Sequence, residues 1–461
     1  MRTMKSFLIT GDRSGSGKTS ITLALSSILS DDFTVQTFKV AMDYIDPSYL
    51  TAVTGRPCRN LDSFVMTPDQ IRDSYANGCI GAEVAVIEGV RGLFEGSEAL
   101  SDTGSTASVA KMLGQNVILV IDARSITRSA AAIVMGFLAY DPDVRIKGVI
   151  LNQIISEKHL NKAKTAIEAA TGIPVIGAIP RRDEMKLTMR HLGLIPFLEG
   201  KKDDEFLKRV DAVKEIVSRN VDIDALLDLA GESPAPVDIP ESFVQAKEKD
   251  VRIGVAVDEA FNFYYNDVFD ILGAKGAEIV TFSPVHDSLP EADGYILGGG
   301  YPEMFAGELE ANDRMREAVL EVSRNGTPIY AECGGLIYLT GELVLKSGWN
   351  DLEADKSYGM CGVFDGKTVM PSKRVIGYVK GVSDSRSPLG EAVFSGHEFH
   401  HTDVRLPKDT HYSYRLSRGS GIIGGFDGAV TNRTQGSYTH LHPLASAGMI
   451  GNFVENCRKK E

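Results

Sequence analysis

A glycine-rich segment near the N-terminus has the pattern of a phosphate-binding loop. Residues 6–20 read SFLITGDRSGSGKTS, a short apolar run followed by a glycine-rich turn and a helix-like segment. Successive backbone N–H groups in such a turn can cradle phosphate oxygens, and the helix N-terminus adds positive potential. Lys18 would reach the β- and γ-phosphates of a nucleotide, and Thr19 would bind Mg²⁺. The candidate nucleotide-binding residues are Gly15, Gly17, Lys18, Thr19 and Ser20.

The spacing in this loop departs from the usual G-x-x-x-x-G-K-[ST] pattern. Counting back from Gly17 places Asp12 where the first glycine is expected, and the glycine is Gly11 instead. The alternative is an ordinary glycine turn followed by a solvated lysine. Because a strand-like run precedes the turn and a helix-like run follows it, we interpret the segment as a variant phosphate loop.

Acidic residues follow the next predicted strands. Asp43 and Asp46 come after VQTFKVAM, Glu88 comes after VAVI, and Glu95 lies further along the same segment. In doubly wound sheets, ligands bind beyond the carboxyl ends of the strands, and Mg²⁺ takes few carboxylates together with phosphate and water. Any one of these residues alone would be an ordinary helix cap or turn residue. Four of them around one phosphate loop favour a metal and substrate site.

A second group of candidate catalytic residues surrounds Cys333. Residues 328–339 read PIYAECGGLIYL, a strand-like run that reaches a cysteine and continues, after two glycines, into a helix-like run. Such a turn exposes the side chain, and the helix N-terminus favours the thiolate. Backbone N–H groups of Gly334, and of Gly299 and Gly300 in the upstream GGG, can hold an oxyanion. A lone cysteine is by default a buried structural residue, but the glycine context favours a nucleophile.

Two segments near the C-terminus contain paired histidines. A thiolate nucleophile needs a base, and His440 and His442 in SYTHLHP are both candidates. The segment HEFHH at 397–401 matches the H-E-x-x-H zinc pattern, which requires both histidines on one helix face. Its flanks, AVFSG and TDVRLP, favour a strand and a turn instead, so we expect no zinc site there.

Composition and charge exclude several classes of protein. The 461 residues are 43% hydrophobic and 24% charged, and 49 basic against 62 acidic residues leave a net charge of −13. This balance argues against bulk electrostatic binding to nucleic acid or to an anionic membrane surface. No apolar run approaches the ~18–20 residues of a membrane helix. The five cysteines are dispersed without a C-x-x-C, which argues against a disulfide scaffold and favours the cytoplasm.

Alternating strand-like and helix-like runs predict how the candidate residues are positioned. Short runs rich in Val and Ile are predicted strands, and they alternate with helix-length segments such as Ser20–Leu29 and Ser105–Leu113. This alternation predicts an α/β fold with a mostly parallel sheet covered on both faces. The predicted strands are Ser6–Thr10, Val35–Val40, Val84–Ile87, Val117–Ile121, Gly148–Leu151, Val251–Val257, Glu278–Phe282, Gly294–Leu297 and Pro328–Ala331.

We predict two domains joined by a linker. Residues 231–250 interrupt the alternation with Pro234, Pro236 and Pro240, charged residues and little periodicity. The predicted organisation is a first domain at 1–230, a linker at 231–250 and a second domain at 251–461.

Together these motifs resemble the cobyrinate a,c-diamide synthase family. The resemblance covers nearly the whole chain, so it is far more specific than the phosphate loop alone. It implies an N-terminal ATP-binding domain similar to dethiobiotin synthetase and a C-terminal class I glutamine amidotransferase domain. The segments that carry it are GDRSGSGKT, FKVAMDYIDPSYLTAVTGRPCRNLD, VIEGVRGLFEG, MRHLGL, DEAFNFYY, LGGGYPEMFA, YAECGGLIYL, GHEFHH and SYTHLH.

The resemblance implies a ligase that uses ATP and L-glutamine to amidate the a and c acetate side chains of a tetrapyrrole. Family members act on cobyrinate or hydrogenobyrinate, or on Ni-sirohydrochlorin in methanogens. ATP would phosphorylate the acetate, and ammonia from glutamine would displace the phosphate. The resemblance is compatible with a cytoplasmic homodimer. The residues assigned to Mg²⁺ are then Thr19, Asp43 and Glu88, and those assigned to the tetrapyrrole are Asp46, Tyr44 and Glu95.

Two positions depart from the pattern of related proteins. Many family members carry aspartate where this chain has Glu95, which keeps the carboxylate but extends its reach. Most class I glutaminases have a glutamate two residues after the catalytic histidine, and here that position is His442. The resemblance therefore implies a dyad of Cys333 and His440.

Two rival functions share part of the pattern. A phosphate-loop ATPase switch of the partitioning type shares the first domain but leaves Cys333 and the second half of the chain unexplained. Cobyric acid synthase is a related amidotransferase with other amidation sites, so the mass of the product and the position of its amides separate the two.

Overall fold

A computed structural model describes residues 3–185, 204–234 and 236–459. The chain divides into two compact units, Met1–Pro240 and Glu241–Glu461. Both are α/β units, in agreement with the predicted fold class, and each is described below by itself.

The first unit is built on an eight-stranded sheet. Seven strands are parallel in the order β3-β2-β4-β1-β5-β6-β7, and β8 pairs antiparallel with the start of β1. The strands are β1 (Thr3–Gly11), β2 (Val35–Val40), β3 (Arg59–Leu61), β4 (Val84–Gly92), β5 (Asn116–Asp122), β6 (Arg145–Ile154), β7 (Val175–Pro180) and β8 (Gly231–Pro234).

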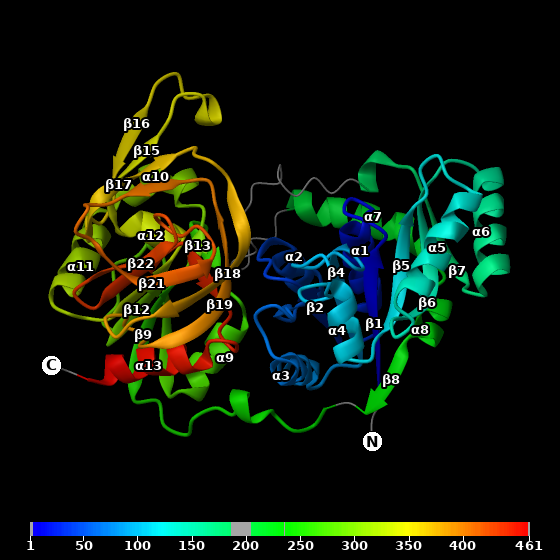
Figure 1. Cartoon of the computed structure of the whole chain (residues 1–461), viewed down its shortest axis with the longest axis horizontal. Coiled ribbons are helices and arrows are strands. Elements are labelled where there is room, and N and C mark those ends of the chain that lie inside the picture. The colour runs from blue at the N-terminus through cyan, green and yellow to red at the C-terminus, as the bar shows by residue number, and fades with distance from the viewer. Residues whose placement is uncertain (1–2, 186–203, 235, 460–461) are drawn as a thin grey trace. The chain divides into compact units, whose positions relative to one another are not determined.

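Helices cover both faces of this sheet (Figure 1). One hydrophobic core packs buried side chains of β1, β4, β5 and β6 against α1, α7 and α8. The strands are buried on both sides, which explains their nearly continuous apolar sequences. The helices are α1 (Lys18–Leu29), α2 (Ile45–Thr54), α3 (Pro68–Cys79), α4 (Thr106–Met112), α5 (Arg128–Tyr140), α6 (Glu157–Thr171), α7 (Asp204–Asn220) and α8 (Ile223–Leu229).

The second unit contains a ten-stranded sheet and two smaller sheets. The large sheet has the order β11-β9-β12-β14-β23-β22-β21-β18-β19-β24, parallel from β11 to β23 and antiparallel beyond. Its strands are β9 (Val251–Ala256), β11 (Ala277–Phe282), β12 (Gly294–Leu297), β14 (Ile329–Glu332), β18 (Val375–Ser383), β19 (Ala392–His400), β21 (His411–Arg418), β22 (Phe426–Thr431), β23 (Thr434–Ser437) and β24 (Thr439–Leu441).

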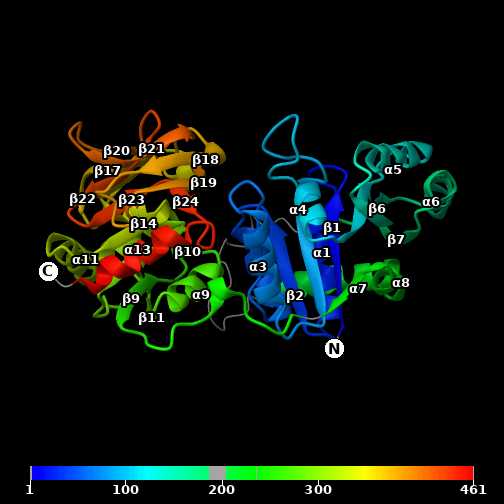
Figure 2. The same ribbon diagram turned by 60° about the horizontal axis from the view of Figure 1, so that its bottom comes forward.

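The smaller sheets and the helices complete this unit. Helices α9 and α13 lie together beside β9 and β11 (Figure 2), while α10, α11 and α12 join the main hydrophobic core. The other strands are β10 (Phe261–Phe263), β13 (Gly299–Gly300), β15 (Thr340–Leu345), β16 (Lys356–Gly359), β17 (Phe364–Met370) and β20 (Asp403–Arg405). The helices are α9 (Asp267–Ala274), α10 (Ala306–Ala311), α11 (Asp313–Arg324), α12 (Gly334–Leu339) and α13 (Ala447–Arg458).

The predicted strands are all present, and most are longer than predicted. Val35–Val40 and Gly294–Leu297 have the predicted bounds. Gly231–Pro234, assigned above to the linker, instead form β8 and pair with Thr3–Ser6. Proline removes a backbone donor but is tolerated in such a short strand end, so the proline signal did not exclude pairing. Within the described residues, no helix is both long and apolar enough to span a membrane.

Candidate functional site

The phosphate loop joins the end of β1 to the start of α1. Gly15 and Gly17 have φ values of 80° and 91°, which glycine adopts without steric cost. A Cβ on Gly17 would lie 2.2 Å from Nδ2 of Asn152, and that amide donates to the carbonyl oxygen of Ser16 at 2.8 Å. A side chain at position 17 would therefore push this support away from the loop.

Lys18 and Thr19, the first residues of α1, face Glu88. The hydroxyl of Thr19 donates to Oε1 of Glu88 at 2.5 Å, and the amine of Lys18 lies 3.7 Å from the same oxygen. The hydroxyl of Ser20 is buried and donates to the carbonyl oxygen of Met185 at 2.9 Å. Lys18 and Thr19 thus share one cluster with Glu88, while the Ser20 side chain is engaged elsewhere.

Lys39 lies at the centre of the acidic residues. Its amine is 2.5 Å from Oδ2 of Asp46, 2.8 Å from Oε1 of Glu88 and 4.0 Å from Oδ2 of Asp43. Only 1% of the Lys39 side chain is exposed. Lys39 and Glu88 are register partners on β2 and β4, so their side chains leave the sheet on the same face.

Burial and charge together determine protonation in this cluster. Burial opposes the charge of Lys39, but the carboxylates of Asp46 and Glu88 raise its pKa well above the usual value. Burial also opposes the charge of Asp46, yet Lys39 holds the pKa of that carboxyl below its usual value. Burial and Asp46 raise the pKa of Asp43 to about 6. Burial, followed by repulsion from Lys39, lowers the pKa of Lys18.

The residues around Thr19 have the donor set that Mg²⁺ requires beside a nucleotide. Atom Oε2 of Glu88 is buried and has no hydrogen-bond partner among the described residues. Over 3–185, 204–234 and 236–459, no three His, Cys, Asp or Glu side chains are grouped to hold a metal ion. Mg²⁺ needs only one or two carboxylates when phosphate oxygens and water supply its other ligands. Thr19 and Glu88 fit that requirement, and Oδ2 of Asp43 lies 4.0 Å from the amine of Lys39, which contacts Glu88.

The remaining predicted substrate residues lie in two places. Tyr44 precedes α2 and Asp46 is in its first turn, where Asp43 accepts hydrogen bonds from the N–H groups of Ile45 and Asp46 at 2.9 and 3.4 Å. Glu95 is exposed after β4 and its carboxylate packs against Gly92. The structure brings Asp43 and Asp46 to the cluster but does not bring Glu95 into contact with it.

In the second unit, Cys333 forms the predicted turn between β14 and α12. Its φ of 45° and ψ of −93° are unusual for a non-glycine residue, and such strain is concentrated at functional sites. Its N–H donates to the carbonyl oxygen of Ser437 at 2.7 Å, which holds the turn in place. Its thiol donates to the carbonyl oxygen of Phe399 at 3.6 Å.

His440 connects the Cys333 thiol to a carboxylate. The two side chains are hydrogen-bonded, and Nδ1 of His440 lies 3.0 Å from Oε2 of Glu332. The other candidate base, His442, has its Nε2 3.7 Å from Oδ2 of Asp267. Of the two histidines, His440 is therefore the one placed to act on the thiol.

The electrostatics also distinguish His440 from its neighbours. Burial disfavours a charged His440, but its hydrogen bonds to Cys333 and Glu332 raise its pKa to about 10. The ring of His397 stacks on His440 with centroids 4.9 Å apart. Burial, together with His440, lowers the pKa of His397 well below the usual value, and burial lowers that of His400 to about 4. Of these three histidines, His440 is therefore the one whose charged form is favoured by its neighbours.

The three glycines predicted to form an oxyanion hole lie side by side. Gly299 and Gly300 form β13, and Gly334 begins α12. A Cβ on Gly334 would lie 2.9 Å from the backbone nitrogen of Gly300, and one on Gly299 would lie 2.7 Å from Cε1 of His440. Such close packing leaves no room for a side chain at these two positions.

Comparisons with known proteins cover both units. A family model described as "CobQ/CobB/MinD/ParA nucleotide binding domain" matches residues 7–195, and "CobB/CobQ-like glutamine amidotransferase domain" matches residues 252–448. Proteins named cobyrinate a,c-diamide synthase from Methanosarcina barkeri and Methanosarcina acetivorans are each 49% identical over 98% of this chain and 95% of the relative. One from Methanothermobacter thermautotrophicus is 40% identical over 97% and 98%. The chain belongs to the cobyrinate a,c-diamide synthase family.

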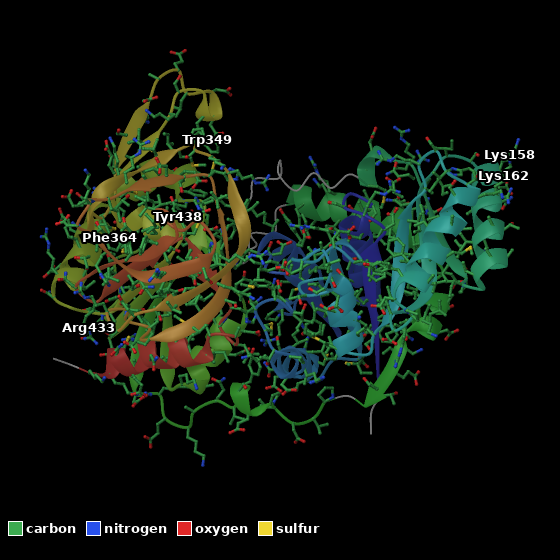
Figure 3. The ribbon with its side chains drawn as sticks, in the orientation of Figure 1. Lys158, Lys162, Trp349, Phe364, Arg433 and Tyr438 are labelled. Atoms are coloured by element: carbon green, nitrogen blue, oxygen red, sulfur yellow. The ribbon has the colours of Figure 1, made fainter. Side chains whose placement is uncertain are left out.

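This membership confirms the family and the fold class predicted from the motifs. As a member of the cobyrinate a,c-diamide synthase family, the chain is an amide-forming ligase with a nucleotide-binding domain and a glutamine amidotransferase domain. The first four residues of the H-E-x-x-H segment at 397–401 end strand β19 (Ala392–His400), and His401 follows it, so the segment is a strand and a turn, as predicted. In it, Glu398 accepts the N–H groups of Ser420 and Gly421, and His400 stacks on Tyr438 with centroids 3.6 Å apart. Tyr438 is labelled in the second unit in Figure 3.

Two charged residues of this family member, Lys39 and Glu332, were not among the predicted site residues. Lys39 stands inside VQTFKV, and a charged residue in an otherwise buried strand signals a buried partner. Glu332 lies between the predicted strand Pro328–Ala331 and the cysteine, and its contact with His440 joins positions more than a hundred residues apart. Its charge in a buried strand is the same kind of signal.

Proposed function

We propose that this chain uses ATP and L-glutamine to amidate the a and c acetate side chains of a tetrapyrrole, either cobyrinate or Ni-sirohydrochlorin. The observation that carries the proposal is the 49% identity over 98% of the chain to proteins named cobyrinate a,c-diamide synthase. The two candidate sites supply the chemistry that such a reaction needs, one in each unit.

The first unit would activate the acetate. A carboxylate oxygen of the tetrapyrrole attacks the γ-phosphorus of ATP, the bond to the bridging oxygen breaks, and ADP leaves. Lys18 and the N–H groups after Gly15 hold the phosphates. When bound, Mg²⁺ would neutralise phosphate charge, and Thr19 and Glu88, with Asp43 near by, are the residues that would hold it. Asp46 and Tyr44 would meet the tetrapyrrole.

The second unit would release ammonia from glutamine. The Cys333 thiolate attacks the amide carbon, forming a C–S bond and an oxyanion that N–H groups of Gly300 and Gly334 stabilise. The C–N bond breaks as His440 gives its proton to the leaving nitrogen. Water then hydrolyses the thioester to glutamate and regenerates the thiol, so one glutamine and one water yield one glutamate and one ammonia.

Ammonia completes the reaction at the activated acetate. Its nitrogen attacks the acyl carbon, an amide bond forms and inorganic phosphate leaves. Two such cycles give the diamide. We further propose that the enzyme acts in the cytoplasm and that it can assemble as a homodimer.

Mass spectrometry of the product tests the proposal. The protein is incubated with ATP, Mg²⁺ and glutamine together with cobyrinate, hydrogenobyrinate or Ni-sirohydrochlorin in separate reactions. We expect two amidations on one of these compounds, with one ADP and one glutamate formed for each amide. Amidation at positions other than the a and c acetates would instead indicate a different amidotransferase, and ATP turnover independent of any tetrapyrrole would indicate an ATPase switch.

A further inference from the structure

The carboxylate of Glu332 is held in place on both of its oxygens. Oε2 lies 3.0 Å from Nδ1 of His440. Oε1 accepts the N–H of Leu441 at 3.1 Å and the hydroxyl of Tyr330. The side chain is 12% exposed, so these bonds take place largely away from water. Because hydrogen bonds hold both oxygens, the carboxylate keeps one orientation toward the imidazole of His440.

We propose that Glu332 is the third member of a glutaminase triad, a positioning residue that holds His440 in the orientation and tautomer that serve Cys333. This inference rests on the proposed glutamine hydrolysis by the second unit. Related glutaminases take this carboxylate from the position two residues after the histidine, which is His442 here. In this chain the carboxylate comes from the residue directly before the nucleophile.

The topology explains how adjacent residues can take two different roles. Glu332 ends β14, and the strand geometry sends its side chain to the opposite side from its neighbours. Strand β23 runs parallel to β14 with Ser437 opposite Glu332, and the chain continues into β24, where His440 and Leu441 contact that carboxylate. Cys333 leaves the strand in its strained turn and meets the same imidazole.

The chemistry follows from which nitrogen carries the proton. When Nδ1 of His440 donates to Glu332, the other ring nitrogen is left to accept the thiol proton. The buried carboxylate then stabilises the imidazolium that forms. Without it, either nitrogen can carry the proton, and the wrong tautomer presents an N–H to the thiol.

Other groups near His440 do not replace Glu332. His397 stacks on its ring from β19, and His400, also on β19, adds a further imidazole. The pKa of both is lowered, so both are neutral near pH 7. Among the described groups around His440, Cys333 and Glu332 are the ones that favour its charged form.

Glutaminase kinetics and thiol alkylation test the proposal together. Glu332→Gln keeps an oxygen for the N–H of Leu441 but removes the charge facing His440. Asp427→Asn is the matched control, because Asp427 is a buried carboxylate that accepts the N–H groups of Tyr438 and Thr439 in the same segment. Iodoacetamide labelling of Cys333, read by peptide mass spectrometry, reports thiolate without catalysis. Burial raises the pKa of the other four cysteines, so they react slowly.

For Glu332→Gln we expect the kcat for glutamine hydrolysis to fall about 10²-fold or more with little change in KM, and alkylation of Cys333 to move to higher pH. Glu332→Asp should recover part of kcat, and Asp427→Asn should keep the wild-type alkylation profile. Wild-type kcat and alkylation profile in a folded Glu332→Gln would overturn the triad. If Glu332→Gln fails to fold, the Glu332→Asp variant serves as the test. Its side chain is shorter, so a wild-type kcat in Glu332→Asp would also overturn the triad. Absence of glutamine hydrolysis in the wild type would contradict the proposed function instead.

Discussion

Lys39 and Glu88 are register partners on the neighbouring strands β2 and β4, and Nζ of Lys39 lies 2.8 Å from Oε1 of Glu88 inside the first unit. Asp46 approaches the same amine to 2.5 Å from the start of α2. Charges so deeply buried are tolerated only when they are paired. Lys39 therefore holds the two carboxylates near the phosphate loop in a defined arrangement. It ties the end of β2 to β4 through Glu88 and to α2 through Asp46.

Removing this buried cation should destabilise the first unit. Lys39→Met leaves Asp46 and Glu88 without their partner, and breaking a buried pair costs about 3–5 kcal/mol of the free energy of unfolding. Urea unfolding followed by circular dichroism measures the loss. The control is Lys214→Met, which removes a more exposed pair with Asp31 at 2.7 Å and should cost no more than about 1 kcal/mol. Equal losses in the two variants would show that the Lys39 network adds no stability.

The fold class and the two local turns, the phosphate loop and the cysteine turn, could be predicted from the sequence because their signals are local. A phosphate loop is a continuous run from β1 to α1, and the cysteine turn is a continuous run from β14 to α12. The contacts made by Lys39 and Glu332 are different. Each depends on which strands become neighbours and in what register, and that information is distributed along the chain. Glu95 is a third case, because its place after a strand suggested a substrate residue and the structure shows only that its exposed carboxylate lies over Gly92, so that role stays a prediction.

The phosphate loop should be required whichever source supplies the nitrogen. We expect Lys18→Ala to abolish amide formation both with glutamine and with added ammonium salt, because activation of the acetate precedes its amination. Hydrolysis of glutamine by the second unit should persist. Product mass spectrometry and a glutamate assay on the same samples check both statements. Diamide formed at the wild-type rate would mean that activation occurs elsewhere.

The thiol should be required for only one of those nitrogen sources. We expect Cys333→Ala to lose glutamine-dependent amidation while amidation with ammonium salt continues, because free ammonia needs no nucleophile for its release. Cys361→Ala is a suitable control, since that thiol is also buried in the second unit. Loss of both activities in a folded Cys333→Ala would be inconsistent with two separate sites.

The two histidines near the C-terminus should differ sharply. His440→Ala removes the histidine that is hydrogen-bonded to Cys333, and we expect the kcat for glutamine hydrolysis to fall by roughly 10²–10⁴-fold. His442 faces Asp267, so His442→Ala should act mainly on stability. Glutaminase kinetics and thermal melts of both variants separate these effects. A larger kinetic loss in His442→Ala would transfer the role of base to that residue.

Protonation of His440 gives this site a pH dependence with a definite sign. Its pKa is about 10 in the folded protein, above the usual value of about 6.5, so its charged form is stabilised by folding. That contribution to stability is complete below about pH 6.5 and disappears as the pH rises toward 10. We expect melting temperatures of the wild type to decline over this window more steeply than those of His440→Ala. Parallel curves would show that the imidazolium is not stabilised.

The two acidic residues that share Lys39 should affect the two amidations differently. Glu88 has no exposed side-chain surface and accepts the hydroxyl of Thr19, so we expect it to act with the nucleotide. Asp46 is 18% exposed at the start of α2, where it can face the tetrapyrrole. Because one site must serve two acetates, the mono-amide has to rebind or pivot between them. A residue that positions the ring should then affect the two steps unequally, whereas a residue that supports nucleotide chemistry should affect both steps equally.

We therefore expect Glu88→Gln to slow both amidations together, by about 10–100-fold. Asp46→Asn should slow them unequally, so that mono-amide accumulates. A time course of mono- and diamide by mass spectrometry distinguishes these patterns, with Asp31→Asn as a surface control. If Asp46→Asn slowed both steps equally and no mono-amide accumulated, Asp46 would belong with Glu88 in activation rather than with the substrate.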